Sequence, residues 1–479
     1  MKPPSLSADP VLAAWARPGL ALLLLAALAC GGNGGPAAID GTLPAPPAIS
    51  VPTTSALGFP VQASVLNGGY ALSYRWTLSA GTFQGGAATA SGPKVTFTPA
   101  TPGVITVSCV AIKGNALLSQ PASQTVTVGA PASTGGSFHS AGSLLQARQG
   151  FAAAALPNST ILVAGGSATL GGSALASAEI YSPATQISTA TPSPMTAARV
   201  GPATATLGSG TQILISGGTG ATGSLASGEL FDSVQMLFRA TGAMANARSG
   251  STATYLITPP AVLIAGGSTT AGNPVPALEL FTPVTGLFSS SGTVPVPLAP
   301  GATATLLPTG KVLLVSHGYA GSAWVPFAAL YDPGTGLATP TAKPPGFPRE
   351  GHQALLLGGK VLILGGDGGN GPLQTAEWYD PATGLFAPSA TDMASPRAYF
   401  GAAVLPGTQA VLLLGGTADG STALATAERF DSVAGTSNPT GALGAARIQP
   451  FVTASNGQIL VLGGYDSSGQ AVAPVEAYF

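Results

Sequence analysis

The stretch KVLILGGDGG, residues 360–369, decides the fold because its pattern returns along the chain. Four apolar residues run directly into a pair of glycines, and ILVAGG, ILISGG, VLIAGG, VLLLGG and ILVLGG repeat the arrangement. A short apolar run without alternation, bounded by turn residues, is typical of a strand that is buried on both faces. Glycine is expected after it because only glycine lets another backbone approach closely. The pattern therefore predicts several equivalent buried strands.

Aligning these pairs divides residues 137–479 into seven copies of one unit, spaced by 48 to 52 residues. We number the copies repeats 1 to 7 in chain order. The aligned positions are Gly165-Gly166, Gly217-Gly218, Gly266-Gly267, Ser316-His317, Gly365-Gly366, Gly415-Gly416 and Gly463-Gly464. Repeat 4 is thus the copy without a glycine pair.

Each complete copy also has an arginine upstream of its glycine pair and a glutamate downstream. An aromatic residue follows two positions after the glutamate, on the same side of a strand. The charged positions are Arg148 and Glu179, Arg199 and Glu229, Arg248 and Glu279, Arg349 and Glu377, Arg397 and Glu428, and Arg447 and Glu476. Repeat 4 loses both charges together, at Ala299 and Ala329. This joint loss predicts that each arginine pairs with the glutamate of its own repeat in a structural role, since half-buried charges need partners.

A unit of about 50 residues has the length of a four-stranded propeller blade. With its glycine pair, Glu-x-aromatic and following turn, it resembles a bacterial kelch repeat, of the kind also found in the galactose-oxidase propeller. The resemblance implies an all-β, seven-bladed kelch-type β-propeller over residues 137–479. The last copy stops at VEAYF, its third strand, and GSFHSAG (136–142) precedes the first copy. We expect residues 136–142 to complete the last sheet and close the ring, which removes its open edge.

Residues 47–129 show short strand patterns between turns and predict a small β-sandwich. Trp76 lies in the alternating run YRWTL with its apolar neighbours on one side. The segment resembles an immunoglobulin-like or PKD-like module. Cys109 stands where the second cysteine of an immunoglobulin domain would lie, but the partner strand VQASVL contains none, so that disulfide is absent. We expect Cys109 to be a buried, unpaired thiol.

The N-terminus has the features of an export signal. Lys2 and Arg17 precede an apolar run that is too short to span a bilayer and ends at Ala-Leu-Ala-Cys. This ending resembles a bacterial lipobox, which implies a lipoprotein signal peptide over residues 1–29, lipid on Cys30 and a flexible linker over 30–46. Gly31 after the cysteine favours the outer membrane. The alternative is an ordinary signal peptide that leaves Cys30 free.

The composition limits the classes of partner. The net charge is −1 and only 7% of residues are charged, so no basic surface is available for nucleic acid. Because 45% of residues are hydrophobic, we expect a folded chain rather than a disordered one.

The sequence does not favour a known propeller chemistry. The copper site of the galactose-oxidase type needs histidines and a tyrosine linked to cysteine, and residues 137–479 contain no cysteine. Sialidase Asp-box motifs are absent as well. Asp367, Asp419 and Asp466 follow the glycine pairs of repeats 5 to 7, where they could form an acidic or cation site. More often, such aspartates simply make Asx turns. His317 and His352 could meet between repeats 4 and 5, although surface positions are expected. We therefore expect no metal and no cofactor.

These observations favour a non-enzymatic binding or adhesion module, a monomer held at the bacterial cell envelope by its lipid. Its partner would be a protein or a carbohydrate. An envelope enzyme acting on polysaccharide and a purely architectural protein are the alternatives. The longer loops between second and third strands are where binding residues should gather. The candidates in them are Tyr319, Trp324, Asp367, Asn370, Asp419, Tyr465 and Asp466, although Tyr319 and Trp324 could instead fill space left by the residues missing from repeat 4.

Overall fold

The computed structural model describes residues 43–51, 54–56, 61–66, 72–83, 87–99, 101, 103–114, 117–129, 136–320, 323–455 and 457–479. They form two compact units, one within residues 43–129 and one within 136–479. All regular elements of the described residues are β-strands. A helix with the length and hydropathy needed to cross a membrane does not occur in these residues. The predicted signal peptide, Cys30 and most of the linker lie outside them.

The N-terminal unit consists of two sheets. One holds β1 (Ile49–Ser50), β3 (Val61–Val65) and β6 (Lys94–Phe97). The other holds β2 (Thr54–Ala56), β9 (Ala122–Gly129), β7 (Gly103–Lys113), β4 (Leu72–Leu78), β5 (Thr89–Ser91) and the short β8 (Leu117–Leu118). Every stretch of this unit with a predicted strand pattern contains one of these strands.

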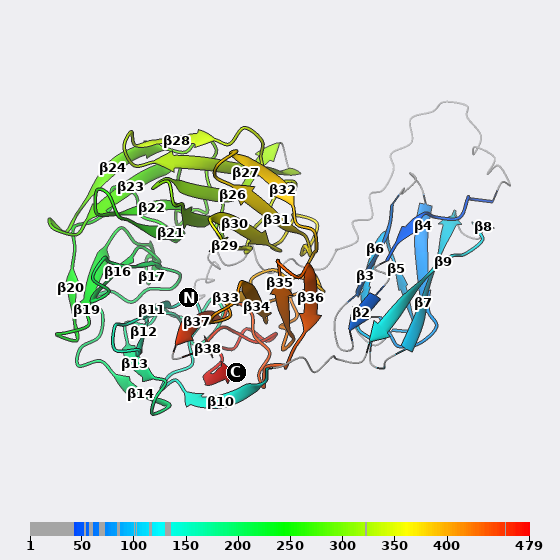
Figure 1. The fold of residues 1–479 in the computed structure, drawn as a ribbon, viewed down its shortest axis with the longest axis horizontal. Coiled ribbons are helices and arrows are strands. Elements are labelled where there is room, and N and C mark those ends of the chain that lie inside the picture. The colour runs from blue at the N-terminus through cyan, green and yellow to red at the C-terminus, as the bar shows by residue number, and fades with distance from the viewer. Residues whose placement is uncertain are drawn as a thin grey trace, which may run out of the picture. The chain divides into compact units, whose positions relative to one another are not determined.

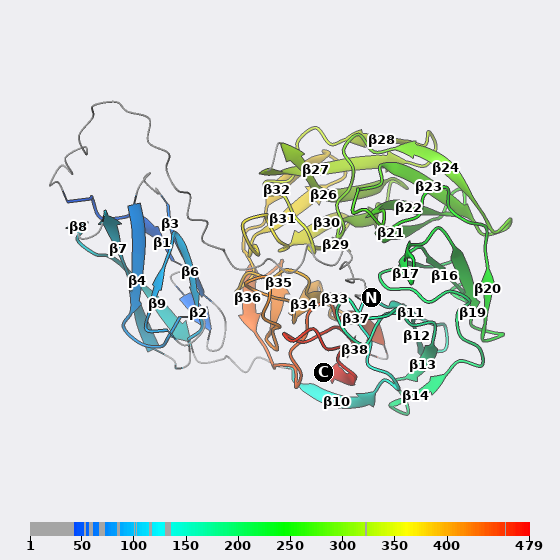
Figure 2. The ribbon, with the colours of Figure 1, turned by 180° about the vertical axis from the view of Figure 1, so that it is seen from behind.

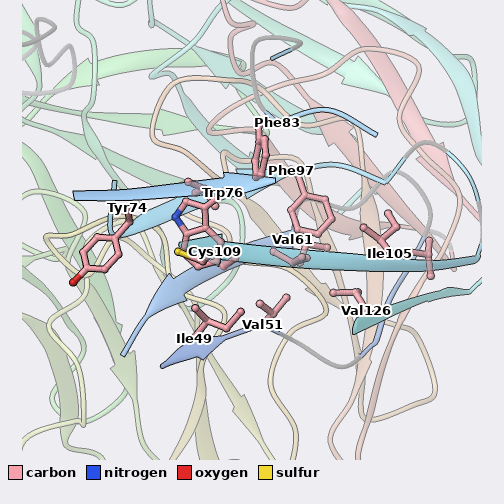
Figure 3. Packing of buried hydrophobic residues seen from close by; sticks show 14 of the residues in the cluster. Ile49, Val51, Val61, Tyr74, Trp76, Phe83, Phe97, Ile105, Cys109 and Val126 are labelled. Atoms are coloured by element: carbon pink, nitrogen blue, oxygen red, sulfur yellow. The ribbon is translucent and has the colours of Figure 1, made fainter. Parts of the chain in front are cut away.

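The core of this unit is built around Trp76, which is fully buried (Figure 3). Trp76 on β4 lies directly opposite Cys109 on β7, and its indole Nε1 donates a hydrogen bond to the carbonyl of Gly92 at 2.8 Å. Phe83 and Phe97 pack edge to face beside them. Cys109 is a buried, free thiol, as the sequence predicts, and burial raises its pKa to about 11.

Residues 136–479 form a ring of sheets, with the first strand of each repeat near the centre and the fourth at the rim (Figures 1 and 2). Repeats 1 and 2 contain β11 (Ala152–Ala155), β12 (Ile161–Ala164), β13 (Ala178–Ser182) and β14 (Ile187–Ala190), then β15 (Ala203–Thr206), β16 (Gln212–Ser216), β19 (Gly228–Asp232) and β20 (Leu237–Ala240), with a small hairpin of β17 (Thr219–Gly220) and β18 (Gly223–Ser224). Repeats 3 and 4 contain β21 (Ser249–Leu256), β22 (Ala261–Ser268), β23 (Ala277–Thr282) and β24 (Leu287–Thr293), then β25 (Thr303–Leu306), β26 (Val312–Ala320), β27 (Ala323–Asp332) and β28 (Leu337–Pro340).

Repeats 5 to 7 continue the ring in the same way. They contain β29 (Gln353–Leu357), β30 (Lys360–Leu364), β31 (Ala376–Asp380) and β32 (Leu385–Pro388), then β33 (Gly401–Val404), β34 (Ala410–Leu414), β35 (Ala427–Asp431) and β36 (Thr436–Pro439), and finally β37 (Phe451–Ser455), β38 (Gln458–Leu462) and β39 (Pro474–Tyr478). Repeats 2 to 6 each form a four-stranded antiparallel sheet in chain order.

The two ends of the ring meet in a shared sheet. β10 (Phe138–Ser143) pairs antiparallel with β39, with Phe138 opposite Tyr478, so the predicted pairing of residues 136–142 with the last strand is confirmed. β10 also touches β14 of repeat 1, which joins repeats 1 and 7 into one eight-stranded sheet. The last repeat is therefore not left with an unpaired third strand.

The second strand of each repeat is buried on both faces. In β30 the four residues Val361 to Leu364 are all buried, and β12, β16, β22, β26, β34 and β38 contain equivalent buried runs. This is the burial that the unbroken apolar pattern predicts.

The strand registers place three key positions at one edge of each sheet. In repeat 5, Gln353 lies opposite Leu364, and Leu364 lies opposite Ala376. The start of the first strand, the end of the second and the start of the third therefore share one face of the ring. We call it the loop face, because it carries the second-to-third loops and the connections between repeats. The opposite face, with the short turns, is the turn face.

The glycine pairs also join neighbouring repeats. Both residues of Gly165-Gly166 have positive φ, 71° and 84°. A Cβ on Gly165 would lie 2.7 Å from the carbonyl oxygen of Arg199 in repeat 2, and the N–H of Gly166 donates to that same oxygen at 2.8 Å. The glycines are thus needed because the end of the second strand turns against the arginine backbone of the next repeat, as it also does at Gly217, Gly365, Gly415 and Gly463.

The expectation that a loop joins the second and third strands of every repeat is wrong for repeat 4. Ser316 and His317 replace the glycine pair, and β26 continues as a strand to Ala320 before β27 returns. Tyr319 pairs with Trp324 in this extension. The physical reason is the missing glycines: without two left-handed residues the backbone stays extended and forms a long hairpin. We call residues 316–320 and 323–327 the repeat 4 hairpin.

Candidate functional site

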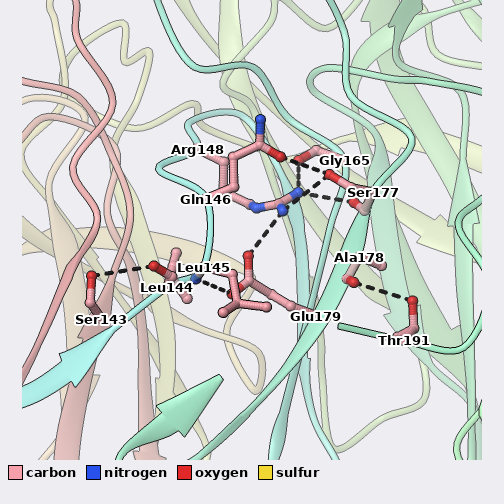
Figure 4. A network of polar contacts seen from close by, with 10 residues as sticks. All are labelled: Ser143, Leu144, Leu145, Gln146, Arg148, Gly165, Ser177, Ala178, Glu179 and Thr191. Carbon is pink, nitrogen blue, oxygen red and sulfur yellow. Dashed lines mark hydrogen bonds and ion pairs between the residues drawn. The ribbon is translucent and has the colours of Figure 1, made fainter. Parts of the chain in front are cut away.

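The six arginine–glutamate sites have one geometry, shown for Arg148 and Glu179 in Figure 4. Arg148 Nη1 donates to the carbonyls of Gly165 and Ser177, while Nη2 lies 2.9 Å from Glu179 Oε1. Glu179 Oε2 accepts the backbone N–H of Leu145 in the incoming connection. One charge pair thus ties the connection, the second strand and the third strand of a repeat together.

The other five pairs also lie within their own repeats, four through Nη2 of the arginine and Arg397 through Nε. The closest nitrogen–oxygen distances are 2.8 Å for Arg199–Glu229, 2.7 Å for Arg248–Glu279, 2.5 Å for Arg349–Glu377, 2.7 Å for Arg397–Glu428 and 2.6 Å for Arg447–Glu476. All twelve side chains are buried. Since these charges already have partners and no access to solvent, a ligand on the loop face must use other groups.

Glu350 is such a group. It is the one of the chain's seven glutamates that does not occupy the repeat position. It follows Arg349 directly, and its backbone pairs with that of Asp367 through hydrogen bonds of 3.0 and 2.7 Å. Its Oε2 lies 3.1 Å from Nε2 of His317, and the Tyr399 phenol also hydrogen-bonds to its carboxylate. The Glu350 side chain is 12% exposed. Side chains from three repeats therefore meet at the Glu350 carboxylate, which is still partly exposed to solvent.

The repeat 4 hairpin holds His317 against Glu350. The imidazole stacks on the indole of Trp324, with ring centroids 3.7 Å apart and planes 7° from parallel. Tyr319 contacts the same imidazole edge to face at 5.2 Å. The loop of repeat 5 supports the far part of this stack, because a Cβ on Gly369 would lie 3.0 Å from the Trp324 ring. Trp324 is thus occupied in packing, whereas Tyr319 is 60% exposed.

Both histidines near this junction are buried, which makes the expectation of surface positions wrong. His317 is 0% and His352 3% exposed. His352 Nε2 lies 2.7 Å from the hydroxyl of Thr303 on β25, between repeats 4 and 5. Burial, followed by the charge of Arg349, lowers the pKa of His352 to about 3. His317 is stacked within the repeat 4 hairpin, and His352 is enclosed between repeats 4 and 5.

Tyr399 occupies a special backbone position near the ring axis. The residue two after the repeat arginine has positive φ in all seven copies, and five of the seven are glycine. Tyr399, with φ of 54°, and Gln449, with 53°, are the exceptions. The N–H groups of this position bond to the carbonyl of the preceding repeat at Gly201, Gly250, Gly351, Tyr399 and Gln449. A left-handed tyrosine is strained, and such strain gathers at functional positions.

The Tyr399 phenol acts as a hydrogen-bond donor. Its ring packs with Ile448 and Tyr465 of repeat 7 and lies against Gly351 of repeat 5. Burial, then the charges of Glu350 and Asp367, raise the pKa of Tyr399 far above its usual range. The phenol therefore stays protonated, so it can donate to a carboxylate but does not supply a phenolate nucleophile.

The aspartates that follow the glycine pairs bond mainly to their own loops. Asp367 Oδ1 accepts the N–H of Gly369 at 2.7 Å. Asp466 Oδ1 accepts the N–H and hydroxyl of Ser468, and these hydrogen bonds lower its pKa. For Asp419, burial raises the pKa, but hydrogen bonds from Thr422, Ser421 and Thr417 outweigh it and bring the pKa to about 2. This geometry is that of Asx turns. The described residues hold no group of three or more His, Cys, Asp or Glu side chains arranged to hold a metal ion.

The remaining sequence candidates differ in access. Tyr465 is 7% exposed and packs with Ile448 and Ala423, and burial raises its pKa to about 12. Asn370 is exposed at the tip of the repeat 5 loop. We call Glu350, His317 and Tyr399 the Glu350 centre. The structure brings Tyr319, Trp324 and Asp367 next to this centre, and Tyr465 packs against Tyr399. The other candidates, which lie in their own loops away from it, are Asp419, Asp466 and Asn370.

Two hollows of the described surface lie elsewhere. The larger of the two, of about 540 Å³, is on the turn face and is lined by residues such as Ile257, Lys311 and Asp332. Its charged pair, Lys311–Asp332, is half exposed on both sides. The interaction energy of such an exposed ion pair is small. The polar groups on the loop face are therefore the stronger candidate for a functional site.

Two members of the centre, Glu350 and Tyr399, were not among the candidates from the sequence. The sequence could have indicated Glu350, because it is the one glutamate that does not occupy the repeat position. It could also have indicated Tyr399, because five other copies have glycine at the equivalent position. Neither signal names a partner, since their contacts are made between repeats.

Comparison with known proteins supports a kelch-type repeat. Residues 348–391, which span repeat 5 from before Arg349 to beyond β32, match the Kelch motif. A solved structure titled "Structure of YjhT" aligns over 60% of this chain and 95% of its own, with 14% identity and a TM-score of 0.46. The search of curated proteins found no match. The chain therefore carries a kelch motif within an all-β propeller.

Proposed function

We propose that this protein is a binding module of the bacterial cell envelope that recognises a protein or carbohydrate partner on its loop face. The single observation that carries the proposal is the Glu350 centre. A partly exposed carboxylate is held by His317 of repeat 4 and Tyr399 of repeat 6, next to the exposed Tyr319. Polar groups beside an exposed aromatic residue, presented by a rigid ring, are typical of a recognition surface.

In this proposal the ring is a seven-bladed propeller. Repeats 2 to 6 account for five sheets, and the eight-stranded sheet is interpreted as the first and last blades joined at β10. The N-terminal unit serves as an immunoglobulin-like or PKD-like spacer, for which its paired sheets and buried Trp76 argue. Lipid on Cys30 would hold the monomeric protein at the outer membrane, and several acyl chains would be needed for stable anchoring.

The experiment maps the partner to one face. Envelope proteins and polysaccharides of the source organism would be tested against the purified chain, and the captured partner would then be titrated against variants. Tyr319→Ala on the loop face should weaken binding at least tenfold. Lys311→Ala, in the turn-face hollow, is the matched control and should leave the affinity unchanged. The reverse result would contradict the proposal.

The anchor has its own test. Cys30→Ser should move the protein from the membrane fraction to the soluble fraction, and mass spectrometry of the wild type should detect lipid on Cys30. A wild-type protein without lipid that still sediments with membranes would contradict the lipoprotein assignment.

An enzyme acting on polysaccharide is the second candidate. Glu350 and Asp367 are carboxyl groups whose backbones pair side by side, which is the observation in its favour. Release of reducing ends from envelope polysaccharide, lost in Glu350→Gln, would support this candidate instead.

A further inference from the structure

We propose that the Glu350 centre binds the side chain of a lysine or arginine presented by a partner protein. This inference rests on the proposed binding function of the loop face and adds the chemical group that is recognised there.

The first argument is that Glu350 has spare acceptor capacity. A carboxylate offers about four lone-pair positions. His317 and Tyr399 use part of this capacity, and the side chain keeps 12% of its surface exposed. Asp367, paired to it along the backbone, accepts its loop hydrogen bonds at Oδ1. Both carboxylates therefore have oxygen available for the N–H groups of a ligand.

The second argument is the charge of the loop face. Carboxylates of the loop face outside the buried pairs include Glu350, Asp367, Asp392, Asp419 and Asp466, whereas Lys343 is a cation of the same face. The six repeat arginines are buried against glutamates. Lys311 and Lys360 pair with Asp332 and Asp380 on the turn face. An anionic ligand would be repelled here, because these carboxylates together carry more charge than Lys343, and a cation would be attracted.

The third argument is the position of Tyr319. Its ring is 60% exposed and stands close enough to Glu350 for that charge to raise its pKa, after burial. An aromatic face beside a carboxylate is a combination that attracts ammonium and guanidinium groups. A basic side chain could place its charge on Glu350 and its methylene groups along Tyr319.

The fourth argument favours a polypeptide over an amino sugar. Stacking on a sugar ring needs an accessible aromatic face, but Trp324 is covered by His317 on one face and supported by Gly369. Among the described residues of the hairpin, Tyr319 is the aromatic side chain that is exposed. A single exposed tyrosine at the rim of a buried charged centre fits one anchoring side chain better than a row of sugar rings.

The test uses the purified full chain and the pentapeptide acetyl-Ala-Ala-Arg-Ala-Ala-amide, titrated by ligand-observed NMR. Its matched control peptide carries citrulline in place of arginine, which keeps the shape and removes the charge. The arginine peptide should bind at least tenfold more tightly than the citrulline peptide, and its affinity should fall as salt is raised. Equal binding of the two peptides would overturn the inference.

The variants locate the site. Glu350→Gln should weaken the arginine peptide at least tenfold, while Asp380→Asn on the turn face should have no effect. Tyr319→Ala, at an exposed position, should weaken it about threefold and guards against misfolding of the first variant. Unchanged affinity in both Glu350→Gln and Tyr319→Ala would overturn the proposal, as would Glu350-dependent binding of a chitosan trisaccharide without binding of the peptide. In each of these cases a native partner mapped to Tyr319 would leave the proposed function intact.

Discussion

Nε2 of His317 lies 3.1 Å from Oε2 of Glu350, although the two residues are 33 positions apart and belong to neighbouring repeats. The contact exists because repeat 4 lacks its glycine pair. The strand that would have ended there continues, and its hairpin carries His317 over the first residues of repeat 5. The departure from the repeat thus creates the polar centre that the regular copies do not have.

The ring closure predicts a large loss of stability when β10 is removed. Replacing residues 138–143 by an equally long Gly-Ser segment should expose the edge of β39 and cause early thermal unfolding with aggregation. His139→Ala, an exposed change within β10, is the control and should melt like the wild type. Melting is followed by circular dichroism and light scattering. Identical melting of the replacement and the wild type would show that β10 does not close the ring.

The buried Arg349–Glu377 pair predicts strong coupling between its members. Glu377→Ala should lower the free energy of unfolding by about 3 kcal/mol, because it leaves a buried guanidinium without its partner. Adding Arg349→Ala should cost little more, as measured by denaturant titration in a double-mutant cycle. Lys360→Ala, which breaks an exposed pair, should cost less than about 1 kcal/mol. Strict additivity of the two buried changes would contradict the pairing.

The neutral, buried His352 predicts a loss of stability as the pH falls. Its pKa is about 3 in the folded protein, against about 6.5 in an unfolded chain, so between these values the unfolded state binds more protons. The unfolding free energy should therefore drop by about 2 kcal/mol between pH 7 and pH 5 from this residue. The contribution is the difference between wild type and His352→Gln in denaturant titrations. Parallel pH profiles would contradict it.

The two left-handed residues near the axis predict opposite responses to glycine. Gln449→Gly should raise the unfolding free energy by up to about 1 kcal/mol, because glycine adopts positive φ without strain. Tyr399→Gly should lower it, since the ring packs with Ile448 and Tyr465 and bonds to Glu350. Stabilisation by both substitutions would mean that the contacts of Tyr399 contribute less than its backbone strain.

The burial of Cys109 predicts an unreactive thiol. With no exposed surface and a pKa of about 11, it should resist iodoacetamide at pH 8 in the native chain and react once guanidinium chloride unfolds it. Intact-mass measurement of Cys30→Ser, which leaves Cys109 as the single cysteine, follows the reaction. Rapid alkylation of the folded protein would show that the N-terminal core opens readily.

Much of the propeller could be predicted from the sequence because its causes are local and repeated. Buried second strands follow from unbroken apolar runs such as VLIL, and the turn after them follows from glycine pairs. The match of the Arg349 and Glu377 positions across six copies pointed to a structural pair, since both charges vanish together in repeat 4.

The polar centre was less accessible to such reasoning. Tyr319, Trp324 and Asp367 were candidates by loop position, but Glu350 and Tyr399 were not. His317 and His352 were expected at the surface and are buried. His317 lies in the repeat 4 hairpin, whose length depends on how the chain continues without glycine, and His352 lies between repeats 4 and 5. A repeat pattern identifies residues that the copies have in common, whereas Glu350, His317 and Tyr399 each occur in one copy alone.

By itself, the sequence therefore determined the repeat and the buried second strands, since both depend on spacing and apolar pattern within a single copy. It also determined the pairing of residues 136–142 with the last strand, because the last copy lacks a fourth strand of its own. Only the tertiary structure decided which exceptional residues meet. Glu350, His317 and Tyr399 come from three copies, and their contacts depend on the curvature of the ring and on the left-handed backbone near its axis. No pattern within one repeat encodes a distance between repeats, so that part of the molecule became visible only in three dimensions.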